Sequence, residues 1–165
     1  MKYEEIIRIA KPLNCDVNEV KKLIITGILQ KKPSITYNGS KVISMPKLSE
    51  QGDSYDFQVV KNNIIESVQI EPNDKVGAIF YVREPYFTLD KHITINSKCY
   101  YRADTTPEIE KLLIDSKLVW KSAITMHIKK ARLFVRLINV QPEAPTNPRA
   151  WKWVYEFARI IPNDM

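Results

Sequence analysis

The sequence predicts an α+β protein, in which a small helical N-terminal part is followed by a mixed or antiparallel β barrel or sandwich that contains one helix. Two observations predict this fold class. Apolar residues recur at helical spacing over about the first 30 residues, whereas short β-branched and aromatic stretches follow one another from about Gln51 onward. With 165 residues and 44% hydrophobic content, the chain can bury a core. We expect two parts, residues 1–48 and residues 49–165.

Two helices are expected at the N-terminus. The first begins near Tyr3, because Ile6, Ile9 and Leu13 recur at helical spacing. After a short break, Asp16 can cap the second helix, and Glu19 three residues later completes a pattern close to a capping box. This second helix is expected to end near Gln30.

A β-hairpin is expected to follow these helices. Two short strand patterns, residues 35–37 and 41–45, surround Asn38-Gly39, the dipeptide typical of a two-residue hairpin turn. The predicted order is therefore helix, tight turn, helix and hairpin.

That order resembles a winged helix-turn-helix. The resemblance rests on residues 6–23, IIRIAKPLNCDVNEVKKL, and on Gly27-Ile28-Leu29 before the hairpin. It implies that three residues face a DNA groove and a fourth lies on the wing: Asn18, Lys21, Lys22 and Lys41. A two-helix cap packed on a larger β domain is the alternative interpretation.

The β-rich part contains eight segments of strand-like length and composition: residues 56–60, 64–70, 76–83, 92–96, 99–102, 124–130, 131–140 and 151–161. One helix interrupts them, with Thr106 as its N-cap, Pro107 at its first position and an end near Lys117. A proline-rich loop over residues 142–148 separates the last two strands.

The stretch VGAIFYVREPYFTLDKHITIN, residues 76–96, resembles the central motif of target-recognition domains in restriction-modification specificity subunits. The shared pattern is a glycine, an apolar and aromatic strand, a Pro-aromatic-aromatic turn, and an acid before an alternating strand. The resemblance implies recognition of a short DNA sequence or a modified base. The alternative is an ordinary β-hairpin core around Phe80 and Phe87.

Charge is concentrated at one end of the chain. The net charge is +6, and residues 116–165 hold nine basic and three acidic side chains, while the two preceding segments nearly cancel. Four of these basic residues are expected to hold phosphates, with the two arginines on one strand face: Lys129, Lys130, Arg132 and Arg136.

The last strand alternates so that Trp151, Trp153, Tyr155 and Phe157 share one face. This face is expected to be the inward side of a β core, and the alternative is a surface on which bases stack. Three residues beside it are further candidates for DNA contacts: Arg149, Trp151 and Lys152.

No motif predicts catalysis, a metal or a cofactor. His92 and His127 form no metal-binding pattern, and the glycines stand alone, which excludes phosphate-loop and dinucleotide signatures. The positive charge and the two resemblances lead us to expect a DNA-binding protein of a restriction or defence system. Because no catalytic motif is found, we expect that it is not an enzyme. Two alternatives stay open: a Mg²⁺-dependent nuclease using Asp74, Asp90 and a lysine, and a module that binds an acidic protein.

The expected location is the cytoplasm. The chain has no apolar stretch long enough to span a membrane, its first residues are acidic rather than signal-like, and Cys15 and Cys99 lie far apart and are expected to be reduced. DNA is the expected partner, no membrane is involved, and a homodimer or a partner subunit stays open.

Overall fold

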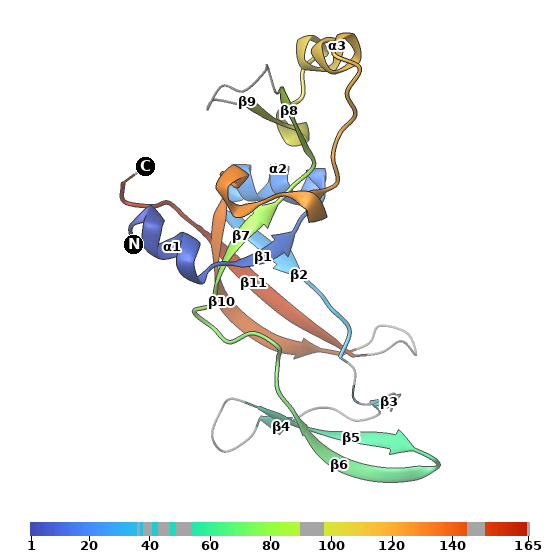
Figure 1. Cartoon of the computed structure of the whole chain (residues 1–165). Coiled ribbons are helices and arrows are strands. Elements are labelled where there is room, and N and C mark those ends of the chain that lie inside the picture. The colour runs from blue at the N-terminus through green and yellow to red at the C-terminus, as the bar shows by residue number, and fades with distance from the viewer. Residues whose placement is uncertain are drawn as a thin grey trace. The chain divides into compact units, whose positions relative to one another are not determined.

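The computed structural model describes residues 1–35, 37, 41–42, 47–48, 54–89, 98–144 and 151–164 (Figure 1). Within these residues the fold is a mixed α+β arrangement, which confirms the predicted class. The chain divides into two compact units. Unit 1 contains Met1–Leu29, Ile79–Arg136 and the C-terminal residues from Ala158, whereas unit 2 contains Gln30–Ala78 and Leu137–Phe157.

The capping box of the second helix is confirmed. Helix α2 spans Val17–Thr26, and the Asp16 side chain accepts a hydrogen bond from the Glu19 amide at 2.8 Å, while the Glu19 carboxylate accepts one from the Asp16 amide at 3.1 Å. The expected end near Gln30 is wrong. Gly27 adopts φ 71°, a left-handed conformation that ends the helix and turns the chain into strand β2, Ile28–Lys31.

The connection between the first two helices also differs from the expected tight turn. Helix α1 spans Tyr3–Ile9, and strand β1, Lys11–Asn14, follows it and pairs in parallel with β7, Ile79–Arg83. Pro12 has no amide hydrogen to donate, and β1 accommodates it because β1 is an edge strand. A strand therefore separates the two helices of the predicted helix-turn-helix.

The main sheet has the order β1-β7-β10-β11-β2, with β10 at Phe134–Glu143 and β11 at Lys152–Ile160. It is mixed, because β7 is parallel to β1 and antiparallel to β10. In the described residues this sheet is open, with β1 and β2 at its edges, and no closed barrel is present.

Unit 1 also contains a two-stranded sheet and a third helix. Strands β8, Tyr86–Leu89, and β9, Lys98–Tyr101, pair antiparallel, and 3₁₀ helix η1, Arg102–Asp104, leads to α3, Pro107–Asp115 (Figure 1). The Thr106 hydroxyl accepts from the Ile109 amide, as expected for the predicted N-cap. The strand predicted over residues 92–96 lies outside the described residues.

The strand predicted over residues 124–130 is wrong. This segment forms two short 3₁₀ helices, η2 at Ala123–Thr125 and η3 at Ile128–Lys130. Its β-branched composition resembles a strand, but each turn closes on its own carbonyls: the Met126 amide donates to Ala123 and the Ala131 amide to Ile128.

Unit 2 is built around the hairpin of β5, Tyr55–Lys61, and β6, Ile64–Ile70. Asn62 and Asn63 have φ 51° and 61°, as a two-residue hairpin turn requires. Two short strands also pair with β5, namely β3, Lys41–Val42, and β4, Lys47–Leu48. The turn predicted at Asn38-Gly39 lies outside the described residues.

Each unit has its own apolar core. In unit 1, Ile6, Ile79, Ala131 and Phe134 form a buried cluster, and Tyr3 packs edge-on against Phe134 at 5.8 Å. In unit 2 the aromatic face formed by Trp151, Trp153, Tyr155 and Phe157 is buried, as we expected for the inward side of a β core. The rings of Trp151 and Trp153 lie 6.3 and 6.1 Å from Phe57.

Candidate nucleic-acid interface

Arg132 is held by two carboxylates in unit 1. Its Nε and a terminal nitrogen donate to the two oxygens of Glu84 at 3.0 and 2.9 Å, and its other terminal nitrogen pairs with Asp104. Glu84 is only 1% exposed and Arg132 25%. Burial raises the pKa of Glu84, and the hydrogen bonds and charge of Arg132 oppose that rise. Arg132 was expected to hold a phosphate, but its charge is already offset here.

The ring of Tyr101 packs against the guanidinium of this ion pair. The Arg132 guanidinium lies 4.1 Å from the centre of the Tyr101 ring, and the Tyr101 hydroxyl donates to the carbonyl oxygen of Lys130 at 2.6 Å. Burial raises the pKa of Tyr101, and it also raises the pKa of the half-buried Cys99 thiol. The arginine is therefore clamped between an aromatic face and two acids.

Three lysines lie beside this clamp, and we call Lys121, Lys129 and Lys130 the lysine cluster. The Lys121 and Lys130 ammonium groups lie 5.8 and 5.4 Å from the centre of the same ring, that of Tyr86, which is 3% exposed. Within the part of the chain that the structure describes, none of the three lysines forms an ion pair with a carboxylate. Two positive charges thus converge on one ring, and no carboxylate among the described residues pairs with either of them.

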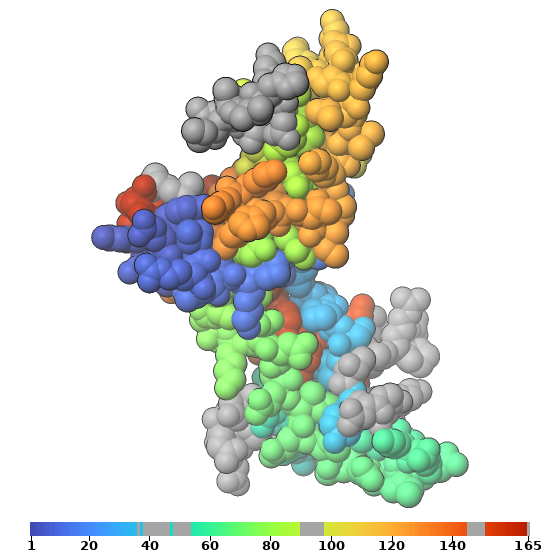
Figure 2. All heavy atoms as spheres, in the orientation of Figure 1, coloured from blue at the N-terminus to red at the C-terminus, as the bar shows by residue number. Residues whose placement is uncertain are grey.

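The backbone fixes these lysines in place. Tyr86 and Lys121 exchange backbone hydrogen bonds, at 3.3 Å from the Tyr86 amide and 2.7 Å from the Lys121 amide. The Tyr86 hydroxyl reaches the carbonyl oxygen of Thr125 at 3.3 Å, and the Lys129 amide donates to Nδ1 of His127 at 3.2 Å. Figure 2 shows the segment around these residues (orange) on the surface, next to the N-terminal residues (blue).

The predicted groove-facing residues lie together on α2. Asn18, Lys21 and Lys22 are exposed, and their spacing of three and four residues puts them on one side of the helix. Asn18 also lines a depression of about 430 Å³ together with Pro85 and Arg102.

The other predicted contacts are scattered. Arg136 is exposed on β10, but it shares no strand face with Arg132, because Arg132 precedes the strand; that prediction is wrong. Lys152 is half-buried in unit 2. Arg149 and the side chain of Lys41 lie outside the described residues.

Trp151 belongs to the core of unit 2. It is 8% exposed, packs on Phe57, and its carbonyl oxygen accepts from the Ile35 amide at 2.8 Å. Its ring is therefore not available for the base contact that the sequence led us to expect.

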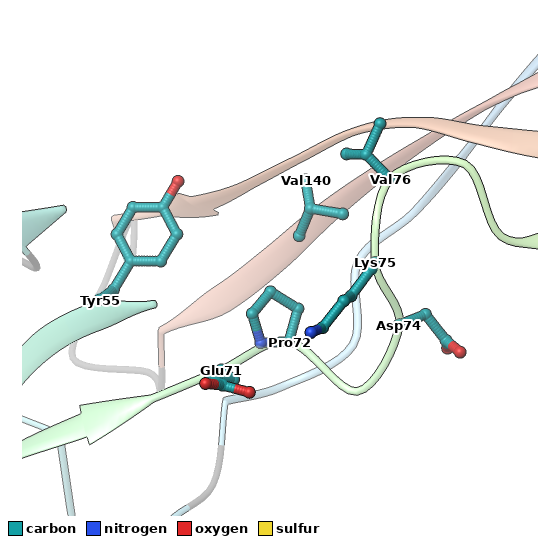
Figure 3. Close-up of a pocket in the computed structure, with 7 residues that line it drawn as sticks. All are labelled: Tyr55, Glu71, Pro72, Asp74, Lys75, Val76 and Val140. Carbon is teal, nitrogen blue, oxygen red and sulfur yellow. The ribbon is translucent and has the colours of Figure 1, made fainter. Parts of the chain in front are cut away.

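Unit 2 contains a cavity of about 280 Å³ (Figure 3). Tyr55, Pro72, Val76 and Val140 supply its walls. Lys75 extends toward Pro72, and the Asp74 carboxylate points away from the other side chains in Figure 3. Asp74 was one acid of the nuclease alternative, and Asp90 lies outside the described residues. Among the residues described, no group of three His, Cys, Asp or Glu side chains could hold a metal ion.

Sequence reasoning identified Lys129 and Lys130 but missed Glu84, Tyr86 and Tyr101. The one indication of Glu84 was an acid inside the mainly apolar and aromatic run of residues 79–89. Its partner lies 48 residues further along the chain. No local pattern connects the two.

Comparison with protein-family models, with curated proteins and with solved structures gave no match. No helix in the described ranges has the length and apolar character needed to cross a membrane.

Proposed function

We propose that this protein binds DNA through the phosphate backbone, with the lysine cluster as its principal contact. The observation that carries the proposal is the convergence of Lys121 and Lys130 on Tyr86 without a carboxylate partner among the described residues. Contact with a ring stabilises an exposed ammonium by about 0.5–1 kcal/mol but leaves its charge in place. An anion between the two ammonium groups would relieve their repulsion.

The chemistry of the cluster favours phosphate as that anion. Lysines bind phosphates as point charges and need no planar geometry. The backbone bonds between Tyr86 and Lys121 fix the main chain of this lysine before any ligand binds, so only its side chain must be ordered on binding. Arg132 has a different role, because its pairing with Glu84 and Asp104 makes it a structural residue that positions Lys130 through Tyr101.

Helix α2 supplies the second part of the proposal. The exposed residues Asn18, Lys21 and Lys22 would approach a groove, as the winged-helix resemblance implies, and exposed Arg136 would add a phosphate contact. We also propose that the protein recognises a specific sequence or a modified base in a restriction or defence system. This part of the proposal rests on the resemblance of residues 76–96 to target-recognition domains.

The experiment is a titration of labelled DNA at salt concentrations from about 50 to 200 mM. Phosphate contacts predict that the logarithm of the binding constant falls linearly with the logarithm of salt concentration, with a slope of several units. An excess of an acidic protein is the control. If no binding is measured at the lowest salt, or if the acidic protein competes better than unlabelled DNA, the proposal fails.

A further inference from the structure

We infer that the nucleic acid this protein takes is a duplex and not a single strand. The inference rests on the proposed function and concerns the same lysine cluster. Proteins that hold single strands without sequence preference combine positive charge with exposed aromatic rings on which bases stack, whereas duplex bases are stacked on each other and leave phosphates as the accessible groups.

The chain offers no exposed ring. All 16 of its aromatic residues, eight Tyr, five Phe and three Trp, lie within the described residues, so their exposure is known throughout. Nine are buried, and the other seven are only partly exposed. A base would therefore have to stack on a ring that is already largely covered.

Two partly exposed rings of unit 1 are already in contact with other groups. Tyr100 stacks on Phe87 at 4.8 Å with an interplanar angle of 12°, and the Lys98 ammonium lies 5.0 Å from its ring centre. Trp120 packs against Phe87 at 4.9 Å, and its Nε1 donates to Glu110 at 3.4 Å. Stacking a base on either ring would displace one of these contacts.

Tyr86 and Tyr101 are engaged in the same way. Tyr86 is covered by Lys121 and Lys130, and Tyr101 carries the Arg132 guanidinium. Tyr86 is buried while Lys121 is exposed, so a cation and not a ring faces the solvent there, which suits contact with a phosphate. A duplex also presents about twice the charge per unit length of one strand, which strengthens binding by charge alone.

The test compares one sequence as a duplex and as a single strand of the same length, with the full chain, at the same salt concentration. We expect the duplex to bind about tenfold tighter or more, with the steeper salt dependence. Tryptophan emission is recorded in the same titration. Trp120 is the partly exposed tryptophan, and a base stacked on it would quench its emission, so we expect no quenching at saturation.

The outcomes separate the two proposals. A single strand that binds as tightly as the duplex, or that quenches the tryptophan emission, overturns this inference and leaves DNA binding standing. If neither form binds at low salt, the proposed function itself fails, and this inference fails with it.

Discussion

Arg132 donates two hydrogen bonds to Glu84, one to each carboxylate oxygen, at 3.0 and 2.9 Å, although the two residues lie 48 positions apart in the sequence. Because Glu84 is buried, loss of the arginine would leave an uncompensated charge in the protein interior. This pair links the residues between β7 and β8 to the segment that carries Lys129 and Lys130.

Removing either partner alone should destabilise the protein strongly. We expect Arg132→Met to lower the free energy of unfolding by about 3 kcal/mol, since it leaves Glu84 buried and unpaired. The double variant Glu84→Leu/Arg132→Met removes both charges and should recover most of that loss. Urea denaturation of the two single variants and the double variant measures the coupling. Additive losses would contradict the ion pair.

Titration of Glu84 should contribute to the pH dependence of the free energy of unfolding. Burial raises the pKa of Glu84 in the folded protein above its ordinary value of 4.5, so the folded state binds this proton more tightly than the unfolded chain. The stabilisation from this group is therefore complete below pH 4.5 and is lost as the pH rises through the folded-state pKa. In Glu84→Gln, unfolding measured across this range should show a smaller decline. An identical decline in the wild type and the variant would exclude the assignment.

Gly27→Ala should destabilise α2 through the backbone alone. At φ 71° a side chain is strained, while a Cβ added at this position meets no atom within 4 Å. We expect a loss of about 1 kcal/mol in the free energy of unfolding. Gly27→Asn is the matched control, because asparagine tolerates the left-handed conformation better and should lose less. Equal losses in the two variants would argue against a conformational origin.

Trp151→Ala should reduce stability and leave the salt dependence of DNA binding unchanged. The ring is buried against Phe57, and truncation of a buried aromatic side chain costs about 3–5 kcal/mol. The binding titration is made at a temperature where the variant is folded, as checked by circular dichroism. A stable variant with weakened DNA binding would instead make Trp151 a ligand contact.

The helices could be predicted from the sequence because their determinants are local. Asp16 with Glu19, and Thr106 with Pro107, mark helix starts within four residues. Strand β1 could not be predicted in this way, because it contains a proline, has little alternation, and owes its hydrogen bonds to β7, whose residues lie more than 60 positions later. The 3₁₀ turns at 123–130 were missed for a different reason: the β-branched composition of this segment resembles a strand, although its turns close through hydrogen bonds between residues three apart.

The candidate site was predictable only in part. Composition located positive charge near Lys129 and Lys130, because charge can be counted along the chain. The sequence does not show which cations are neutralised, because the carboxylates that pair with Arg132, those of Glu84 and Asp104, come from other parts of unit 1. The structure therefore moves the proposed contact from the arginine to the neighbouring lysines.

The most direct test of the account is the salt slope of duplex DNA binding in Lys121→Gln/Lys130→Gln, measured beside a control, Lys61→Gln/Lys111→Gln. The control removes the same charge from two lysines that are exposed and lie outside the lysine cluster. Each lost phosphate contact lowers the slope by about 0.9, so the cluster variant should lose about two units, and the control should keep the wild-type slope. Equal slopes in the two variants would contradict phosphate binding by the lysine cluster.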